Sequence, residues 1–269
     1  MAAVLSRTIA AFCIIDDALQ AMGHKDDPQT KVPSSVILTL AILAAMELGG
    51  KHNKALALAK DLNLFTHVPS PSRFNRRLHA LYPLFLPLLH LLSQVWKSLH
   101  QAQAYALDTF PLPACENIRA PRSRQVYRGF VPSKRVHFHG LKLHLLLDDG
   151  KFIHEVNLSP GSLHDLSSLL LLPLDLPEGA ELHMDRGYES HLSEDLLREA
   201  QGIVPTVIRR YVPWLQYLAV VGWRVVETVG GMLHAMFPRR IHAVTQEGFA
   251  IKVLSFVLAH NLKLLTEMA

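Results

Sequence analysis

Cysteine is nearly absent from this chain, which has only Cys13 and Cys115 among 269 residues. Two distant cysteines form no C-x-x-C motif and no disulfide framework, and this usage fits a reducing cytoplasm. Charged residues are also few, at 19%, whereas apolar residues make up 49%. That much apolar side chain offsets the entropy lost on ordering, so global disorder is excluded.

An excess of charge of either sign is missing overall, because 27 basic and 23 acidic side chains leave a formal net charge of only +4. The charges are unevenly distributed, however. Residues 148–205 carry a net −9, whereas residues 1–102, 103–147 and 206–269 carry +4, +5 and +4. Basic segments around an acidic one suggest a polyanion held beside a carboxylate-rich, metal-binding centre. The alternative is that the acids lie on exposed helices.

A long, unbroken apolar run is lacking too. The longest uncharged stretch, Leu78–Trp96, contains Pro83 and Pro87, so it predicts buried helices with proline breaks rather than a membrane span. The short apolar run Thr8–Ile15 is followed at once by two aspartates, which is a poor cleavage site for a signal peptide. We therefore expect a protein without membrane attachment.

Residues 1–102 are predicted to be helical throughout, because their apolar residues recur with helical periodicity. The breaker Pro69-Ser70-Pro71 precedes a short basic helix, whose first N–H groups Ser72 is predicted to cap. Arginine and asparagine are suited to bidentate contacts with DNA bases, and this helix carries Arg73, Asn75, Arg76 and Arg77. The alternative is a solvated helix end.

Beyond residue 102 short strands alternate with helices. Tyr105–Asp108 predicts a strand that Pro111 and Pro113 should end, and Asp148-Asp149-Gly150 predicts a turn between two later strands. We expect strands over 136–147, 152–158, 180–184 and 203–208, and helices over 164–172, 191–200, 226–237 and 247–268.

This order describes an α/β fold in which helices flank a mixed sheet, and it matches the ribonuclease H-like fold. The chain is thus predicted to have two parts: an all-α N-terminal DNA-binding region, 1–102, and a ribonuclease H-like catalytic domain, 103–269.

Three acids could carry out chemistry in the second part. Asp108 and Asp185 follow the predicted strands 105–107 and 180–184, at whose carboxyl ends open α/β sheets bind ligands. Glu227 lies in a later predicted helix and could supply a third oxygen ligand. Carboxylates at close range favour a divalent cation between them. Alone, each acid is also explained as a turn residue or a solvated helix residue.

Several ordered motifs resemble the DDE transposases of bacterial insertion sequences, in particular the insertion sequence nine-eight-two family. The resemblance spans nearly the whole chain and rests on the segments 12–17, 72–78, 107–113, 138–145, 158–165, 184–188, 224–228 and 258–262.

The resemblance implies that Asp108, Asp185 and Glu227 form a catalytic triad holding two Mg²⁺ or Mn²⁺ ions. It implies a DNA transposase that binds terminal inverted repeats, cleaves one strand at the element end and joins it to target DNA. The partner would be double-stranded DNA, bound by at least a homodimer because two ends must be brought together.

Further basic and aromatic residues are candidate DNA contacts. Arg186 and Arg224 flank the predicted acids and could hold phosphates, with an ion pair to a neighbouring acid as the alternative. Tyr188 could stack on an unpaired base or simply be buried, and Lys142 could contact a phosphate. A basic segment predicted to clamp phosphates contributes Arg119, Arg122, Arg124, Arg128, Lys134 and Arg135.

Two features depart from the family pattern. Gly230 and Gly231 follow Glu227 within a predicted helix, and His234 stands where a basic residue is usual. Glycines weaken a helix interior, which favours the alternative of a noncatalytic DNA-binding protein derived from a transposase. A metal-dependent nuclease of the same fold that only hydrolyses DNA is the other alternative. The 16 histidines show no metalloprotease motif and are interpreted as packed or surface residues rather than zinc ligands.

Overall fold

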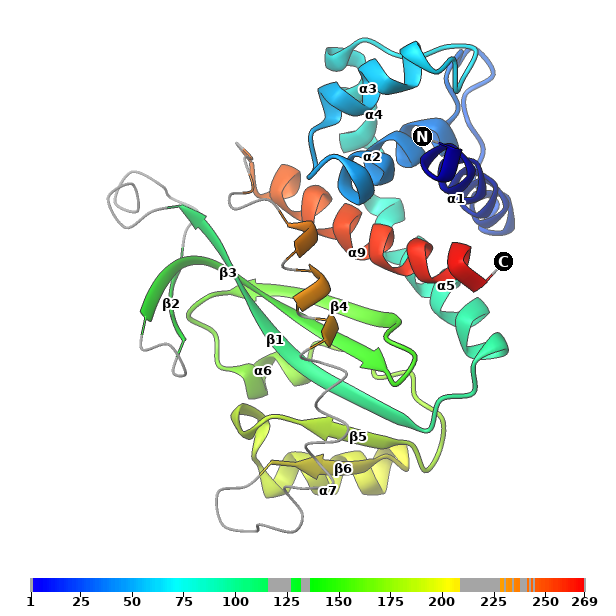
Figure 1. The fold of residues 1–269 in the computed structure, drawn as a ribbon. Helices are drawn as coiled ribbons and strands as arrows, with labels where there is room; N and C mark the ends of the chain where they lie inside the picture. Colours follow the sequence, from blue (N-terminus) through cyan, green and yellow to red (C-terminus); the bar gives the residue numbers. More distant parts are fainter. Residues whose placement is uncertain are drawn as a thin grey trace. The chain divides into compact units, whose positions relative to one another are not determined.

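The computed structural model describes residues 2–115, 127–131, 136–208, 228–229, 231–233, 235–237, 241, 243 and 245–268. The chain divides into two compact units, which are residues 1–96 with 233–269, and residues 97–232. We call them unit 1 and unit 2 and describe each by itself (Figure 1).

The described elements of unit 1 are helical. They are α1 (Ala2–Ala21), α2 (Ser34–Glu47), α3 (His52–Asp61), α4 (Pro71–Ala80), the 3-10 turn η1 (Tyr82–Leu84), the first part of α5 (Phe85–Leu99) and α9 (Gln246–Met268). Residues 34–45 of α2 are all buried, and α2 contacts α1, α3, α4 and α9. The apolar sequence of α2 thus forms the centre of this unit.

Of the two proline breaks predicted in 78–96, the one at Pro83 is confirmed, since Pro83 lies in η1 between α4 and α5, whereas Pro87 lies in the first turn of α5 and breaks no helix. The predicted cap is wrong, because α4 begins at Pro71 and Ser72 lies inside the helix, with Ser70 at the N-cap position. Proline suits the first helical turn, where its missing N–H costs nothing.

One helix, Gln246–Glu267, is apolar and long enough to cross a membrane by length and composition, and two bent helix pairs pass the same test only as pairs. In the structure 78% of the apolar window of this helix is buried. Packing inside unit 1 therefore accounts for its hydropathy.

Unit 2 contains a six-stranded mixed sheet flanked by helices. Its strands are β1 (Ala104–Cys115), β2 (Tyr127–Val131), β3 (Val136–Asp148), β4 (Ile153–Pro160), β5 (Glu181–Met184) and β6 (Val204–Val207). Its helices include α6 (Asp165–Leu169), the 3-10 turn η3 (Arg186–Tyr188) and α7 (His191–Gln201). The predicted α/β class and mixed sheet are confirmed.

The sheet order is β2-β3-β1-β5-β6, and β4 also pairs with β3. β3 runs antiparallel to β1, β2 and β4, whereas β5 is parallel to both β1 and β6. A buried cluster holds residues of both the sheet and its helices, among them Leu107, Met184, Leu169 of α6 and Leu197 of α7. The cluster includes Leu107 and Met184, which directly precede Asp108 in the middle of β1 and Asp185 after the end of β5.

β1 continues through Pro111 and Pro113, so the prediction that these prolines end the strand is wrong. Both prolines pair with β3 on one edge, opposite Lys142 and Gly140. On the other edge, β5 pairs only with Ala104–Leu107 among the described residues. Beyond Leu107, every second N–H of β1 points to the edge where β5 no longer pairs with it. Proline, which has no N–H, is therefore tolerated at these positions.

Three further differences concern lengths and boundaries. β2 forms within the segment predicted as a loop, because it pairs with the first residues of β3. α6 ends at Leu169 rather than at residue 172. The predicted second domain runs to residue 269, whereas α9 packs with α2 in unit 1. The apolar surface of α2 needs a helical partner, and α9 supplies it.

Candidate functional site

The first two predicted acids come from neighbouring positions of the sheet. β1 and β5 are parallel with Leu107 opposite Met184, so Asp108 and Asp185 are the next residues along these two strands. Asp185 keeps an extended backbone, with φ −70° and ψ 164°. Asp108 is half-buried and Asp185 is exposed. The sheet thus brings the two carboxylates to one place at the carboxyl end of β5.

Each of these carboxylates is oriented in the same way by its own backbone. Asp108 Oδ1 accepts the N–H of Thr109, and Asp185 Oδ1 accepts the N–H of Arg186, both at 2.6 Å. Asp185 thereby caps the 3-10 turn η3. A carboxylate anchored through one oxygen has fewer rotamers to lose when it binds a ligand.

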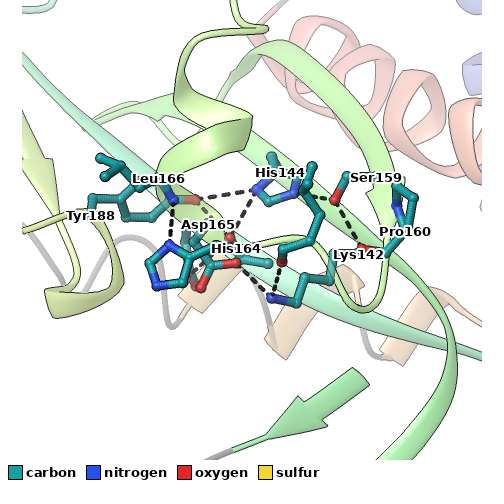
Figure 2. Close-up of polar contacts among 11 residues, drawn as sticks. Lys142, His144, Ser159, Pro160, His164, Asp165, Leu166 and Tyr188 are labelled. Atoms are coloured by element: carbon teal, nitrogen blue, oxygen red, sulfur yellow. Dashed lines mark hydrogen bonds and ion pairs between the residues drawn. The ribbon is translucent and has the colours of Figure 1, made fainter. Parts of the chain in front are cut away.

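A buried hydrogen-bond network lies next to these acids, on the side of β1 opposite Asp108, because successive strand residues face opposite sides. Thr109 Oγ1 lies 2.6 Å from the Tyr188 hydroxyl and 2.9 Å from Nδ1 of His144. Nε2 of His144 lies 2.7 Å from the Ser159 hydroxyl (Figure 2). This network joins β1, β3, β4 and η3, and so holds the turn after Asp185 against the strand that carries Asp108.

The histidine of this network is neutral near pH 7. Burial lowers the pKa of His144 to about 4, and the Lys142 cation acts in the same direction. Burial also raises the pKa of the Tyr188 phenol, with the negative charges of Asp165, Asp108 and Asp185 acting in the same direction. Neutral imidazole has one donor and one acceptor nitrogen, which matches its two hydroxyl neighbours.

The predicted contact of Tyr188 with an unpaired base is not supported. The tyrosine is 1% exposed and belongs to the buried cluster of unit 2, so its ring offers no open face for stacking. The alternative interpretation, burial of a tyrosine after a turn, holds.

Lys142, predicted as a phosphate contact, makes an internal ion pair. Its Nζ lies 2.8 Å from Asp165 Oδ1 and 2.9 Å from the carbonyl oxygen of Leu163 (Figure 2). The lysine cation is therefore used inside unit 2, where it holds the start of α6 against β3. At the start of α6, His164 Nδ1 accepts the N–H of Leu166 and so caps the helix. A Cβ on Gly187 would lie 2.9 Å from Asp165 Oδ2, so a larger residue there would require the Asp165 side chain to shift.

The predicted base-contacting residues of α4 differ in their surroundings. Arg73, Asn75 and Arg76 are exposed. Arg77 is half-buried, and its guanidinium lies 3.1 Å from Asp26 Oδ1 and 3.3 Å from the Ser34 hydroxyl. Arg77 therefore has a structural role in unit 1, whereas the other three remain candidates for contact with DNA.

The other predicted site residues divide into two groups. Arg128 of β2 and Arg186 of η3 are exposed. The remaining predicted residues lie outside the described part of the chain, and they are Arg119, Arg122, Arg124, Lys134, Arg135, Arg224 and Glu227.

One group of side chains in the described residues could hold a metal ion, and it was not predicted. It consists of His100, Asp148 and Asp149, whose ligand atoms lie within 4.8 Å of one another. The sequence marks the two aspartates only as a turn, and nothing in it links them to a histidine 48 residues earlier. Their proximity depends on the pairing of β1 with β3.

Comparison with protein-family models finds no match for this chain. Comparison with curated proteins likewise finds no match.

Proposed function

We propose that this chain is a DNA transposase that cleaves and joins DNA strands through Asp108, Asp185 and Glu227. One observation carries the proposal: two acids 77 residues apart in sequence occupy neighbouring positions of the sheet, Asp108 within β1 and Asp185 directly after the carboxyl end of β5, the kind of strand end where α/β proteins bind ligands. The motif resemblance predicts these same two acids as members of a catalytic triad.

The strand order supports the same proposal. Without β2, the order is β4-β3-β1-β5-β6, with antiparallel pairing among the first three strands and parallel pairing among the last three. This order supports a ribonuclease H-like sheet, in which Asp108 of β1 and Asp185 after β5 would face one another. β2 is then an addition to the edge of β3.

The donor set fits a hard divalent cation, because Mg²⁺ and Mn²⁺ prefer carboxylate oxygens. Asp108 and Asp185 would hold two such ions together with Glu227. When bound, the ions supply activation of an attacking oxygen and stabilisation of the leaving oxygen at phosphorus. The charges of both aspartates already act on the pKa of Tyr188, which indicates that they concentrate negative potential here.

The surrounding residues would keep this site in shape. The hydroxyl network of Thr109, Tyr188 and neutral His144 fixes η3, and the Lys142–Asp165 pair fixes the start of α6 beside it. Buried, satisfied hydrogen bonds of this kind specify one arrangement of the backbone. Asp185 would therefore be positioned without any change on binding DNA.

Recognition of DNA would come from basic surfaces. Arg73, Asn75 and Arg76 would read the terminal repeat, and the segment 119–135 would hold phosphates without regard to sequence. Lowering the charge of this segment should weaken binding to all DNA and flatten its salt dependence. The protein would act in the bacterial cytoplasm, on the nucleoid, as at least a homodimer.

The test is incubation of the purified protein with labelled duplex DNA carrying candidate inverted repeats, with Mg²⁺ or Mn²⁺. Wild type should give joined products, and Asp108→Asn or Asp185→Asn should lower the rate by at least about 1,000-fold, since each removes an ion ligand. Asp195→Asn, an exposed aspartate paired with Arg198 on α7, is the matched control and should react like wild type.

Other outcomes separate the alternatives. Nicked DNA without joined products would favour a nuclease of the same fold. Selective binding with no cleavage, and no effect of Asp108→Asn, would favour a noncatalytic DNA-binding protein and reject the proposal.

A further inference from the structure

We propose that unit 2 holds a second metal site, for a zinc-type divalent cation, between His100, Asp148 and Asp149. This site is separate from the proposed catalytic acids. Asp148 pairs with Tyr105 of β1, whereas Asp108 pairs with Leu145, so the two lie three residues apart along the strands, or about 10 Å. The proposed site lies at the start of β1 and the end of β3.

The central ligand, Asp148, is fully buried and held in place by the β3–β4 turn. Its Oδ1 accepts the N–H of Phe152 at 2.9 Å, and its Oδ2 lies 3.1 Å from His154 Nε2. The side chains of Asp148 and His154 are 0% and 1% exposed. A metal-binding carboxylate supported by a backbone N–H and an imidazole is oriented before the ion arrives, which raises affinity.

The other two ligands lie at the surface. His100 Nε2 and Asp149 Oδ1 are 2.8 Å apart, and their side chains are 38% and 52% exposed. Ligand atoms around a tetrahedral zinc ion, at about 2.0–2.1 Å from it, lie about 3.3 Å from one another. The three ligand atoms lie within 4.8 Å of one another, so shifts of about 1.5 Å complete the site. The exposed side leaves a coordination position for water.

The local charge favours a cation. Two of the three proposed ligands are carboxylates, and the ligand atoms lie within 4.8 Å of one another. Like charges at this separation repel each other, and a divalent ion bound between them would offset that repulsion.

The chain contains a matched pair that should not bind a metal. His79 Nδ1 and Glu247 Oε1 in unit 1 are also 2.8 Å apart, with side chains 36% and 47% exposed. The described residues offer this pair no third ligand of the kind that Asp148 supplies. The difference between the two pairs is therefore the buried, preoriented carboxylate.

The experiment is calorimetric titration of tag-free, full-length protein with ZnCl₂. The parent is Asp108→Asn/Asp185→Asn, so that ions at the proposed catalytic acids do not contribute. We expect one Zn²⁺ per chain, with affinity lowered at least 10-fold by His100→Ala and by Asp149→Asn, and unchanged by His79→Ala or Glu247→Gln. Co²⁺ should give the visible spectrum of a tetrahedral site in the parent and in the His79→Ala and Glu247→Gln controls, but not in His100→Ala or Asp149→Asn.

Folding of each variant is checked by its thermal midpoint without metal, which should match that of the parent because both altered side chains are exposed. Zn²⁺ should raise the midpoint of the parent and of the His79→Ala control, but not that of His100→Ala. Equal affinity in the parent and in His100→Ala, or no binding at micromolar Zn²⁺, would overturn the proposal. Because the parent lacks the catalytic acids, neither result bears on the transposase proposal.

Discussion

The chemistry of individual residues in unit 2 depends on burial more than on residue type. His144, which the sequence gives no reason to single out from 15 other histidines, is buried between two hydroxyl groups. Because its pKa is lowered in the folded chain, the unfolded chain takes up a proton first as the pH falls. Its contribution to stability is therefore complete above pH 6.5 and is lost as the pH falls towards 4.

This linkage predicts the acid sensitivity of unit 2. As the pH falls from 6.5 to 5, protonation of His144 in the unfolded chain should lower the free energy of unfolding by up to about 2 kcal/mol. His144→Gln should be less stable at pH 7, because it disturbs the network, yet should lose less stability on acidification. Urea denaturation at pH 7 and 5 measures both effects, with exposed His191→Gln as control. An equal loss in variant and wild type would contradict the assignment.

Two arginines one residue apart on α4 should behave differently. Arg77→Ala removes the guanidinium that contacts Asp26 and Ser34, and should lower the free energy of unfolding by about 1 kcal/mol. Arg76→Ala changes an exposed side chain and should stay within about 0.5 kcal/mol. On the proposed function, Arg76→Ala instead weakens binding to the terminal repeat. Thermal denaturation and titration with duplex DNA separate the two effects, and identical behaviour would reject the distinction.

At the scale of elements, glycine has opposite effects in two places. A Cβ on Gly129 of β2 would lie 2.5 Å from the Phe138 ring and 2.6 Å from the Gly161 carbonyl oxygen. At Gly231, an exposed helical residue, a Cβ would meet no described atom within 4 Å. The close approach keeps β2 against β3, whereas the helical glycine only costs backbone entropy.

The corresponding substitutions should therefore have opposite signs. Gly129→Ala should destabilise the chain by about 1–3 kcal/mol and speed amide exchange in β2. Gly231→Ala should stabilise it by about 0.5–1 kcal/mol, because alanine favours the helix. Denaturation with hydrogen exchange measures both. If Gly231→Ala also raised the rate of DNA cleavage, the glycines near Glu227 would be shown to weaken the site, and a destabilising Gly231→Ala would contradict the predicted open space.

At the scale of the whole molecule, the C-terminal helix stabilises the N-terminal helices. Phe256 of α9 is 1% exposed, its ring lies 4.7 Å from that of Phe237, and a Cβ on Gly50 would lie 3.0 Å from it. Phe256→Ala should lower the stability of unit 1 by about 3–5 kcal/mol.

The division into units predicts where that loss appears. Amide exchange after Phe256→Ala should accelerate in α2 and α9 and stay unchanged in β1, β3 and β4. Exposed Leu99→Ala is a suitable control, with little change anywhere. A uniform acceleration in both units would show that they unfold together.

The sequence by itself determined most element types, because periodicity and turn chemistry are local, although the segment that forms β2 was predicted as a loop. Alternation predicted β3 and β4 with the turn between them, and α7 ends at Gln201, one residue beyond the predicted end, where Gly202 has a φ of 63°. Asp108 and Asp185 could be named because both follow buried strand sequences. β1 continues past its prolines, which the sequence did not predict. A strand tolerates proline wherever no neighbouring strand accepts a hydrogen bond from that position, and the sequence does not show where this holds.

Only the tertiary structure decided which residues meet. The pairing of Thr109 with His144 and of Tyr105 with Asp148 depends on the β1–β3 register. The sequence alone does not determine this register, because a long segment separates the two strands. The same register creates both the network beside the proposed catalytic acids and the proposed zinc site. The partner of α9 was likewise undetermined, because an apolar helix shows that it will be buried but not against what.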